Sequence, residues 1–288
     1  MSVSSYVTAG SVDDVLAALA GGARPVAGGT DLVVGARSGK SSLPESLVAI
    51  HRVAELRGVR VSADGLRLGA LASHEAICEN EEIQERYSAL ADACTIVGSH
   101  ATRAQGTVGG NLMNASPAME TGGPLICLGA TVTLRSATGE RTIDLADLFT
   151  GPGTTVAEPG ELLISVAVPA PAAGTGSAYL RLEYRRQMEI AVVGASAVVT
   201  VDGNKVTAAR VAMTALAPTI RRVPEAEALL VGSDGDAAAI EAAGAAVAAA
   251  ATPISDVRGS ADYRRAMAAV ITGRAIERAI ARAREDAA

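Results

Sequence analysis

The chain has 288 residues, 49% of them hydrophobic, and a formal net charge of -6 at pH 7, so two or three ordinary subdomains with buried cores are expected. Aromatic residues make up only 2%, which argues against a stacking surface for single-stranded nucleic acid, and the negative charge argues against polyanionic partners. No apolar run reaches the roughly 18 residues of a membrane helix, and the first ten residues do not resemble a secretory signal.

Helices and strands alternate in the first fifty residues. Ser11 is typical of a helix N-cap, and Asp13 and Asp14 follow in the first turn, where the helix dipole favours acidic side chains. A short strand then runs directly into Gly28 and Gly29. The predicted elements are a helix over 12–19, a strand over 25–27, a helix from 32 to about 37 and a buried strand over 46–50.

The next stretch combines hairpins with one helix and a long loop. Turn residues separate pairs of strand patterns and predict hairpins over 60–71 and 131–144. Glu82–Val97 is amphipathic and predicts a single helix. Gly98–Pro124 is glycine-rich without clear periodicity, which predicts a long loop, and such loops are usually functional. A strand over 162–168 follows.

A change of composition near residue 170 divides the chain. Ala170–Ser177 is small, polar and proline-bearing, as linkers are. Beyond it, the patterns predict strands over 178–185, 192–201 and 206–216, then helices over 224–231, 237–250 and 261–284. This order predicts an α+β protein of two domains.

Cysteine and histidine form no recognisable site in the sequence. Cys78, Cys94 and Cys127 are well separated, with no CxxC pair and no metal-ligand spacing. Three buried thiols in a reducing, cytoplasmic compartment are therefore expected. The three histidines are equally scattered, so neither a zinc site nor a Ser/His/Asp triad is indicated.

The first segment with chemical meaning is Ala27–Leu32. Gly28 and Gly29 can adopt positive φ and lack a Cβ, so their N–H groups can converge on an anion. The Thr30 hydroxyl and the start of a helix add further donors. The Asp31 carboxylate would repel phosphate, so we expect it to cap the helix or bind a sugar hydroxyl. A tight structural turn is the alternative interpretation.

A second segment of this kind is Gly106–Asn111. Three glycines surround Thr107 and Val108 and leave the backbone open to a pyrophosphate. No Lys follows in the P-loop pattern, and no GxGxxG follows a first strand, so neither a P-loop enzyme nor a Rossmann site is indicated. Two such segments suit a dinucleotide with two phosphates.

Together, AGGTDL at 27–32 and TVGGNLMNASPAME at 107–120 resemble the FAD-binding medium subunit of the molybdenum hydroxylases. This family includes carbon monoxide dehydrogenase and xanthine dehydrogenase-like enzymes. The segments 161–169, 179–195 and 260–274 resemble the same family, so the resemblance runs through nearly the whole chain. The second glycine motif is its most specific part.

The resemblance implies a particular fold. A p-cresol methylhydroxylase-like FAD-binding domain over 1–170 would consist of two α/β subdomains, about 1–55 and 56–170. A C-terminal domain over 177–288 would contain a three-stranded antiparallel sheet with helices.

The resemblance also implies a site for non-covalent FAD, without catalytic residues or metal ligands on this chain. The pyrophosphate and ribityl region would contact Ala27, Gly28, Gly29, Thr30, Asp31, Leu32, Thr107, Val108, Gly109, Gly110 and Asn111. Val97 stands where relatives contact FAD, and Leu163 or Leu162 would lie against the flavin or adenine. Glu120 stands where relatives commonly carry an Asp that binds a ribose hydroxyl, and Arg181 where some carry Lys. Both substitutions relative to the family keep the charge of the side chain but change how far it extends.

The implied function is electron relay. A large partner subunit would hold the molybdenum cofactor and oxidise the substrate. A small partner subunit with two 2Fe-2S clusters would pass electrons to FAD on this chain, for release to an external acceptor. With three cysteines the chain cannot itself ligate a four-cysteine cluster. The family's usual assembly is a dimer of heterotrimers.

Two other functions stay open on the sequence. A stand-alone flavin oxidase or reductase of the same FAD superfamily would need its own catalytic acid or base, and no convincing set of residues for that is present. A non-redox scaffold or binding module would use the glycine segments only as turns.

Overall fold

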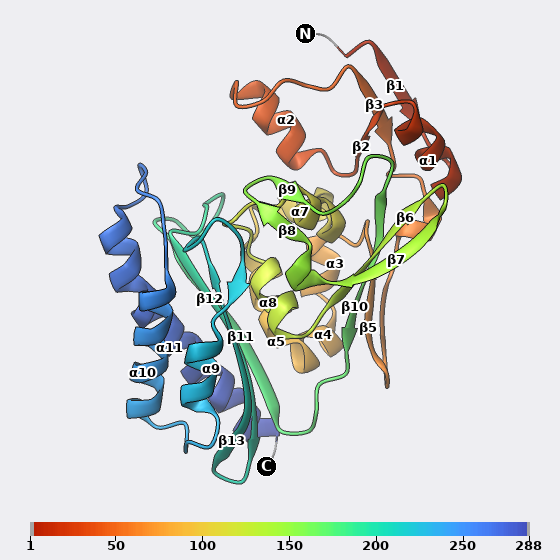
Figure 1. Ribbon diagram of the computed structural model, residues 1–288. Helices are drawn as coiled ribbons and strands as arrows, with labels where there is room; N and C mark the ends of the chain where they lie inside the picture. The colour runs from red at the N-terminus through yellow and green to blue at the C-terminus, as the bar shows by residue number, and fades with distance from the viewer. Residues whose placement is uncertain (1–2, 287–288) are drawn as a thin grey trace.

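Three main sheets carry residues 3–286, which the computed structural model describes (Figure 1). They are a three-stranded parallel sheet in the order β1-β3-β2, a five-stranded sheet in the order β4-β5-β10-β6-β7, and a four-stranded sheet in the order β11-β12-β13-β14. Strands β8 and β9 form a small separate pair. None of the helices within the described range is long and apolar enough to cross a membrane.

The N-terminal lobe, residues 3–55, contains the parallel sheet. Ser11 caps α1 by accepting from the Asp14 N–H, as the sequence predicts, and the Asp14 carboxylate accepts in return from the Ser11 N–H. Val15 and Val48 are fully buried between α1 and the sheet. No sequence pattern predicted β1, which is an exposed edge strand. The elements are β1 (Ser5–Thr8), α1 (Val12–Ala20), β2 (Arg24–Val26), α2 (Thr30–Arg37) and β3 (Ser46–Ala49).

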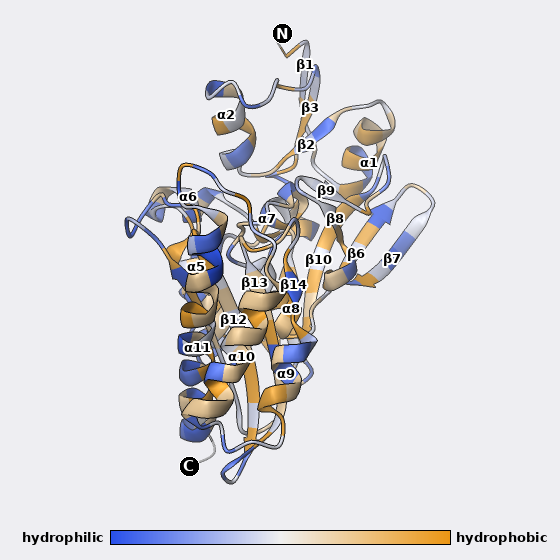
Figure 2. Ribbon diagram, turned by 60° about the vertical axis from the view of Figure 1, so that its left-hand side comes forward, coloured by the Kyte–Doolittle hydropathy of each residue, from blue (hydrophilic) through white to orange (hydrophobic). Residues whose placement is uncertain are grey.

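The five-stranded antiparallel sheet is built around β10 (Leu162–Pro169), which pairs with β5 on one side and β6 on the other. β10 is hydrophobic along most of its length in Figure 2, as a central strand must be. Both predicted hairpins are present. Before β10 the chain forms η1 (Ala54–Leu56), β4 (Val59–Ser62), β5 (Gly65–Gly69), β6 (Thr131–Ser136), β7 (Gly139–Asp144), η2 (Leu145–Asp147), β8 (Phe149–Gly151) and β9 (Thr154–Thr155).

Six short helices lie between β5 and β6, and here two predictions were wrong. Residues 82–97 are not one helix, because Tyr87 leaves the helical region (φ -131°, ψ 43°) to bury its ring. Residues 98–124 are not a loop, because the hydroxyls of Ser99 and Thr107 cap two further helices. The six are α3 (His74–Cys78), α4 (Glu81–Arg86), α5 (Ser88–Ile96), α6 (His100–Gln105), α7 (Val108–Asn114) and α8 (Gly122–Cys127).

The C-terminal sheet is covered on both faces. Helices α9, α10 and α11 lie on one side in Figure 1, and α5 and α8 lie on the other. β11 begins inside the predicted linker, at Thr175, and ends at Leu182 rather than at residue 185; a two-residue fourth strand extends the predicted three. The elements are β11 (Thr175–Leu182), β12 (Val193–Asp202), β13 (Lys205–Thr214), β14 (Arg221–Arg222), α9 (Pro224–Leu230), α10 (Ala237–Ala250) and α11 (Ala261–Asp286).

Asp92 on α5 joins the C-terminal sheet and α11 to the rest of the molecule. Its carboxylate accepts from both terminal nitrogens of Arg282, at 2.7 and 3.0 Å, and from the Tyr179 N–H at 3.2 Å. Arg282 also donates to the Ser177 carbonyl at 2.6 Å. Because the Asp92 side chain is only 16% exposed, this contact is shielded from solvent more than a surface ion pair is.

Asp92→Ala should lower the free energy of unfolding by roughly 2–4 kcal/mol, because it leaves a half-buried guanidinium and a backbone N–H without their acceptor. Asp13→Ala is the matched control: Asp13 pairs with Arg135 at 3.1 Å but is 82% exposed, so its loss should cost less than about 1 kcal/mol. Urea denaturation of both variants measures the difference. Equal losses would contradict the role of Asp92.

Candidate cofactor-binding site

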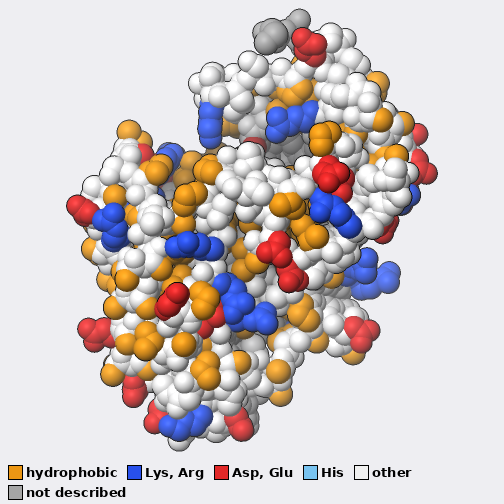
Figure 3. Space-filling view, in the orientation of Figure 1, with side chains coloured by type: hydrophobic (Ala, Val, Ile, Leu, Met, Phe, Trp, Pro, Cys, Tyr) orange, Lys and Arg blue, Asp and Glu red, His pale blue; other side chains and the backbone are white. Residues whose placement is uncertain are grey.

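The two glycine segments that the sequence singles out lie against each other. An ideal Cβ on Gly28 would lie 1.8 Å from the carbonyl oxygen of Gln105, and one on Gly110 would lie 3.9 Å from the Cβ of Ala27. Only a residue without a side chain at position 28 permits this approach. Figure 3 shows a hollow at this level, between the N-terminal lobe and the rest of the molecule.

The start of α2 offers unpaired backbone donors at this junction. Gly29 is the N-cap, in the left-handed region (φ 70°), and no side chain caps the helix. Within residues 3–286 no acceptor lies in hydrogen-bond geometry to the N–H groups of Thr30, Asp31 or Leu32. The Asp31 side chain does not cap the helix, so of its two expected roles only the contact with a sugar hydroxyl stays open. Three free N–H groups at the positive end of a helix are what a phosphate group requires.

The second glycine segment uses its N–H groups differently from the first. Val108 and Gly109 donate to the carbonyls of Ala72 and Ala70, each at 2.9 Å, and Gly110 donates to the Thr107 hydroxyl at 3.1 Å. The first two of these bonds attach α7 to the turn after β5. The segment therefore offers a fixed surface rather than the free backbone donors expected from its composition.

Asn111 and Thr107 are the polar side chains that the second segment presents. The Asn111 amide oxygen accepts from the Thr121 hydroxyl at 2.6 Å, which orients the amide nitrogen away from Thr121. Thr107 is the N-cap of α7 and Asn111 lies in its first turn, where the neighbouring Gly110 faces Ala27 of the first glycine segment. The two segments thus combine backbone donors from one helix with side-chain groups from another.

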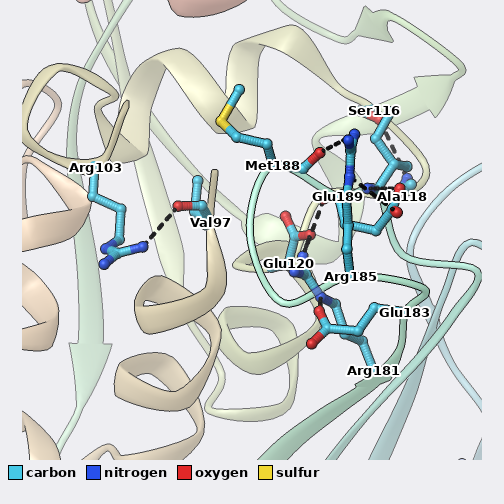
Figure 4. A network of polar contacts seen from close by, with 11 residues as sticks. Val97, Arg103, Ser116, Ala118, Glu120, Arg181, Glu183, Arg185, Met188 and Glu189 are labelled. Carbon is cyan, nitrogen blue, oxygen red and sulfur yellow. Dashed lines mark hydrogen bonds and ion pairs between the residues drawn. The ribbon is translucent and has the colours of Figure 1, made fainter. Parts of the chain in front are cut away.

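The remaining predicted residues lie in three different surroundings. Val97 ends α5, and its carbonyl accepts from Nη1 of Arg103 at 3.3 Å (Figure 4). Leu163 is 2% exposed in the core beside the five-stranded sheet, and Leu162 is 5% exposed in the core of the N-terminal lobe. The side chains of both leucines are therefore fully used in packing.

Glu120 and Arg181, predicted as separate contacts, meet each other. Their ion pair is 2.5 Å long, with the Arg181 side chain 1% exposed and that of Glu120 10% exposed. Arg181 also pairs with Glu183 at 2.5 Å and donates to the Glu189 carbonyl at 3.3 Å (Figure 4). The pair joins the segment before α8 to β11.

Residues 183–190, after β11, fold over the turn between α5 and α6. The Met188 N–H donates to the Gly98 carbonyl at 2.9 Å, and Arg185 donates to the Met188 carbonyl at 2.6 Å. Arg185 also pairs with Glu189 at 3.4 Å. Met188 has a positive φ of 53°, which a bulky residue adopts only where its surroundings enforce it.

Two buried titratable groups lie near these segments. Burial raises the pKa of Glu120 to about 7, and the Arg181 guanidinium opposes that rise. Burial lowers the pKa of His74 to about 4, and the positive charge of Arg103 adds to the effect. His74 lies beneath the second glycine segment, where its Cδ2 is 3.1 Å from the ideal Cβ position of Gly106.

Sequence reasoning missed the residues that support the two segments. Gln105, Ala70 and Ala72 contribute only backbone carbonyls, which no side-chain pattern reveals. Arg103 and His74 lie in polar stretches, near Thr102 and Gln105 and between Ser73 and Glu75 respectively, so no pattern in the sequence marks them.

No other site competes with this one within residues 3–286. No group of three potential metal ligands is present there, and all three cysteines are free, with Cys78 only partly buried. A shallow groove of about 620 Å³ lies between α1 and the β6–β7 hairpin. None of the glycine-segment residues lines that groove.

Comparisons with known proteins identify the family of the chain. Residues 2–171 match the family described as the FAD binding domain in molybdopterin dehydrogenase, and residues 178–279 match the CO dehydrogenase flavoprotein C-terminal domain. The chain is 34% identical to the carbon monoxide dehydrogenase medium chain of Afipia carboxidovorans, over 91% of this chain and 90% of that one. It is 29% identical to the putative xanthine dehydrogenase FAD-binding subunit of Escherichia coli K12, over 97% of each.

Solved structures of related proteins also match the chain over nearly its whole length. A chain of the reconstituted CO dehydrogenase from Oligotropha carboxidovorans superposes with a TM-score of 0.92 at 32% identity, over 96% of this chain and 98% of that one. A chain of quinoline 2-oxidoreductase from Pseudomonas putida 86 superposes with a TM-score of 0.90 at 29% identity, over 99% and 98%.

The fold and the family matches define an FAD-binding flavoprotein. The chain belongs to the family of FAD-binding subunits of the molybdenum hydroxylases, which confirms the resemblance seen in its sequence. It is a flavoprotein subunit of a multi-subunit molybdenum-containing oxidoreductase.

The raised pKa of Glu120 predicts a pH dependence of stability. Between the usual pKa of 4.5 and about 7, the folded state keeps a proton that the unfolded chain has released, so the free energy of unfolding falls as pH rises through this window. Glu120→Gln should remove this fall, a difference of a few kcal/mol (about 1.4 per pKa unit). Urea denaturation at several pH values measures it.

His74 affects the pH dependence of stability in the opposite direction. Its lowered pKa destabilises the fold as pH falls from 6.5 towards about 4. Because this effect is common to the wild type and Glu120→Gln, it cancels in their difference. Parallel stability curves for the two proteins would contradict the buried, proton-binding state of Glu120.

Proposed function

We propose that this chain is the FAD-carrying electron-transfer subunit of a molybdenum hydroxylase complex. It would accept electrons from 2Fe-2S clusters on a small partner subunit and pass them to an external acceptor. The observation that carries the proposal is the meeting of two glycine segments at the free N-terminus of α2. This is a site for a diphosphate with long groups on either side.

The residues present fit FAD at this junction. The N–H groups of Thr30, Asp31 and Leu32 would bind the pyrophosphate, with Ala27, Gly28 and Gly29 giving it close access to the backbone. Thr107 and Asn111 would hold the ribityl region through their side chains, and the fixed turn formed by Val108, Gly109 and Gly110 would set their position. The Asp31 carboxylate is left for a sugar hydroxyl. FAD supplies the electron transfer itself, while the protein binds, orients and tunes it.

The other assigned residues take narrower roles. Val97, partly exposed at the end of α5, would contact the cofactor through its side chain. Leu163 would contact it only through the backbone of β10, because its side chain lies in the core. Glu120 and Arg181 would border the site as a pair, with Arg181 fixing the carboxylate that faces the ribose hydroxyls.

The partners follow from the relatives. The names of these relatives include medium chains and subunits of dehydrogenase complexes. We assign to this chain a large molybdenum-cofactor subunit and a small 2Fe-2S subunit as partners, in a cytoplasmic dimer of heterotrimers. The FAD domain would span residues 1–170 and the C-terminal domain residues 177–288, close to the two family matches.

Gly110→Val should abolish FAD binding. A Cβ at position 110 would lie 2.9 Å from the Thr107 hydroxyl, and the added methyl groups would push against the first glycine segment. Gly10→Ala is the matched control, because its Cβ would lie 3.6 Å from the nearest atom, which is ordinary contact. The ratio of visible flavin absorbance to protein in the purified variants measures binding. Full flavin occupancy in Gly110→Val would refute the role of the second segment.

Purification of the native complex tests the function as a whole. We expect FAD, molybdenum and 2Fe-2S clusters in one assembly, and substrate should bleach the flavin only when the small subunit is present. A colourless, FAD-free native complex would contradict the proposal. Substrate turnover by this chain alone would favour a stand-alone flavin enzyme instead.

A further inference from the structure

Four buried polar atoms gather on one face of the C-terminal sheet without a hydrogen-bond partner. They are the hydroxyls of Tyr179, Ser196 and Thr214 and the Nη2 atom of Arg181. Within residues 3–286, no protein group lies in hydrogen-bond geometry to any of them. All four side chains are at most 1% exposed, so bulk solvent does not reach these atoms.

The strand register places these side chains next to one another. Tyr179 and Arg181 are two residues apart on β11 and therefore point to the same face. Tyr179 pairs with Ser196, while Gly194 pairs with Arg181 on one side and Thr214 on the other. The four atoms thus form one continuous patch across β11, β12 and β13.

Helix α8 covers this patch. An ideal Cβ on Gly123 would lie 2.5 Å from the Ser196 hydroxyl and 3.2 Å from the Thr214 hydroxyl. Gly194 leaves room for the Tyr179 ring, whose hydroxyl would be 2.7 Å from a Cβ there. Burial raises the pKa of Tyr179, and the Thr214 hydroxyl lies close enough to that of Tyr179 to oppose this larger effect, but the two hydroxyls do not meet in the geometry of a direct hydrogen bond. Two hydroxyls that face each other in this way can both form hydrogen bonds to one bridging molecule.

Unpaired buried polar groups bear the full penalty of losing their hydration, and folded proteins relieve it with ordered internal water. We propose that the face between α8 and strands β11–β13 binds ordered water, which bridges the Tyr179 and Thr214 hydroxyls to Nη2 of Arg181. Ser196 lies at the same patch as a further ligand. The inference concerns the buried face of the sheet and does not depend on a bound cofactor.

The water site has a consequence for the Glu120–Arg181 pair. Nη1 and Nε of Arg181 already hold Glu120 and Glu183. Water on Nη2 fixes the third side of the guanidinium and completes its set of acceptors. Tyr179 and Thr214 are then positioning residues, which act on Glu120 through Arg181.

Removal of single hydroxyls from the purified full chain tests the site. Thr214→Val and Tyr179→Phe should each lower the melting temperature by roughly 2–4 °C, because each removes a ligand of the bridging water. The double variant should lose about as much as the worse single variant, because the ligands act as a unit. If both single variants are as stable as the wild type or more stable, the hydroxyls are simply unpaired and the proposal fails.

Thr272→Val is the matched control. The Thr272 hydroxyl on α11 is also fully buried and without a partner, but it lies outside the patch. Its removal should leave the melting temperature unchanged or raise it. A loss equal to that of Thr214→Val would show a general cost of the substitution and would overturn the interpretation of both variants.

Two further measurements test the proposal if one of these variants folds poorly. A crystal structure of the wild-type complex should show ordered water within about 2.8 Å of the Tyr179 and Thr214 hydroxyls; a dry patch in a crystal with internal water elsewhere would overturn the site. In the wild type, Glu120 makes the free energy of unfolding fall as pH rises from 4.5 to about 7. In Thr214→Val, this fall should extend to higher pH, because Arg181 is held less firmly. If the fall ends at the same pH as in the wild type, Tyr179 and Thr214 do not position Arg181.

Discussion

The close approach of Gly28 to the backbone of Gln105 is the contact on which the rest of the site depends. An ideal Cβ at position 28 would overlap the Gln105 carbonyl oxygen at 1.8 Å, so the N-terminal lobe can meet the second glycine segment only through a glycine. This contact brings the free N-terminus of α2 to the start of α7. The hydrogen bonds from Val108 and Gly109 to the turn after β5 then hold α7 in place. The helix end that we propose for phosphate binding is thereby held against the second glycine segment.

A second constraint lies where the C-terminal sheet meets the helices of the FAD domain. Arg181, on a strand of that sheet, is buried and pairs with Glu120 and Glu183, and breaking a buried pair of this kind costs more than making it contributes. Asp92 binds the same strand from α5 through the Tyr179 N–H. The two contacts lie two residues apart near the C-terminal end of β11, so they hold the end of the strand from which the segment 183–190 continues over the α5–α6 turn.

Much of the fold was predictable because its signals are local. The Ser11 cap, the two hairpins and the helix over 237–250 depend on neighbouring residues only. The single helix over 82–97 was wrong because periodicity does not show that Tyr87 leaves the helix to enter the core. The meeting of Glu120 and Arg181, 61 residues apart, and of Gly28 and Gln105 could not be derived locally. The two glycine segments could be predicted because each is rich in glycine, and the family resemblance connected them.

The central claim is that FAD lies at the junction of the two glycine segments. The most direct measurement is a crystal structure of the native complex with its flavin. We predict the pyrophosphate oxygens within hydrogen-bond distance of the Thr30, Asp31 and Leu32 N–H groups, with Thr107 and Asn111 beside the ribityl chain. FAD bound elsewhere on the chain, or a pyrophosphate with no contact to the start of α2, would contradict the account.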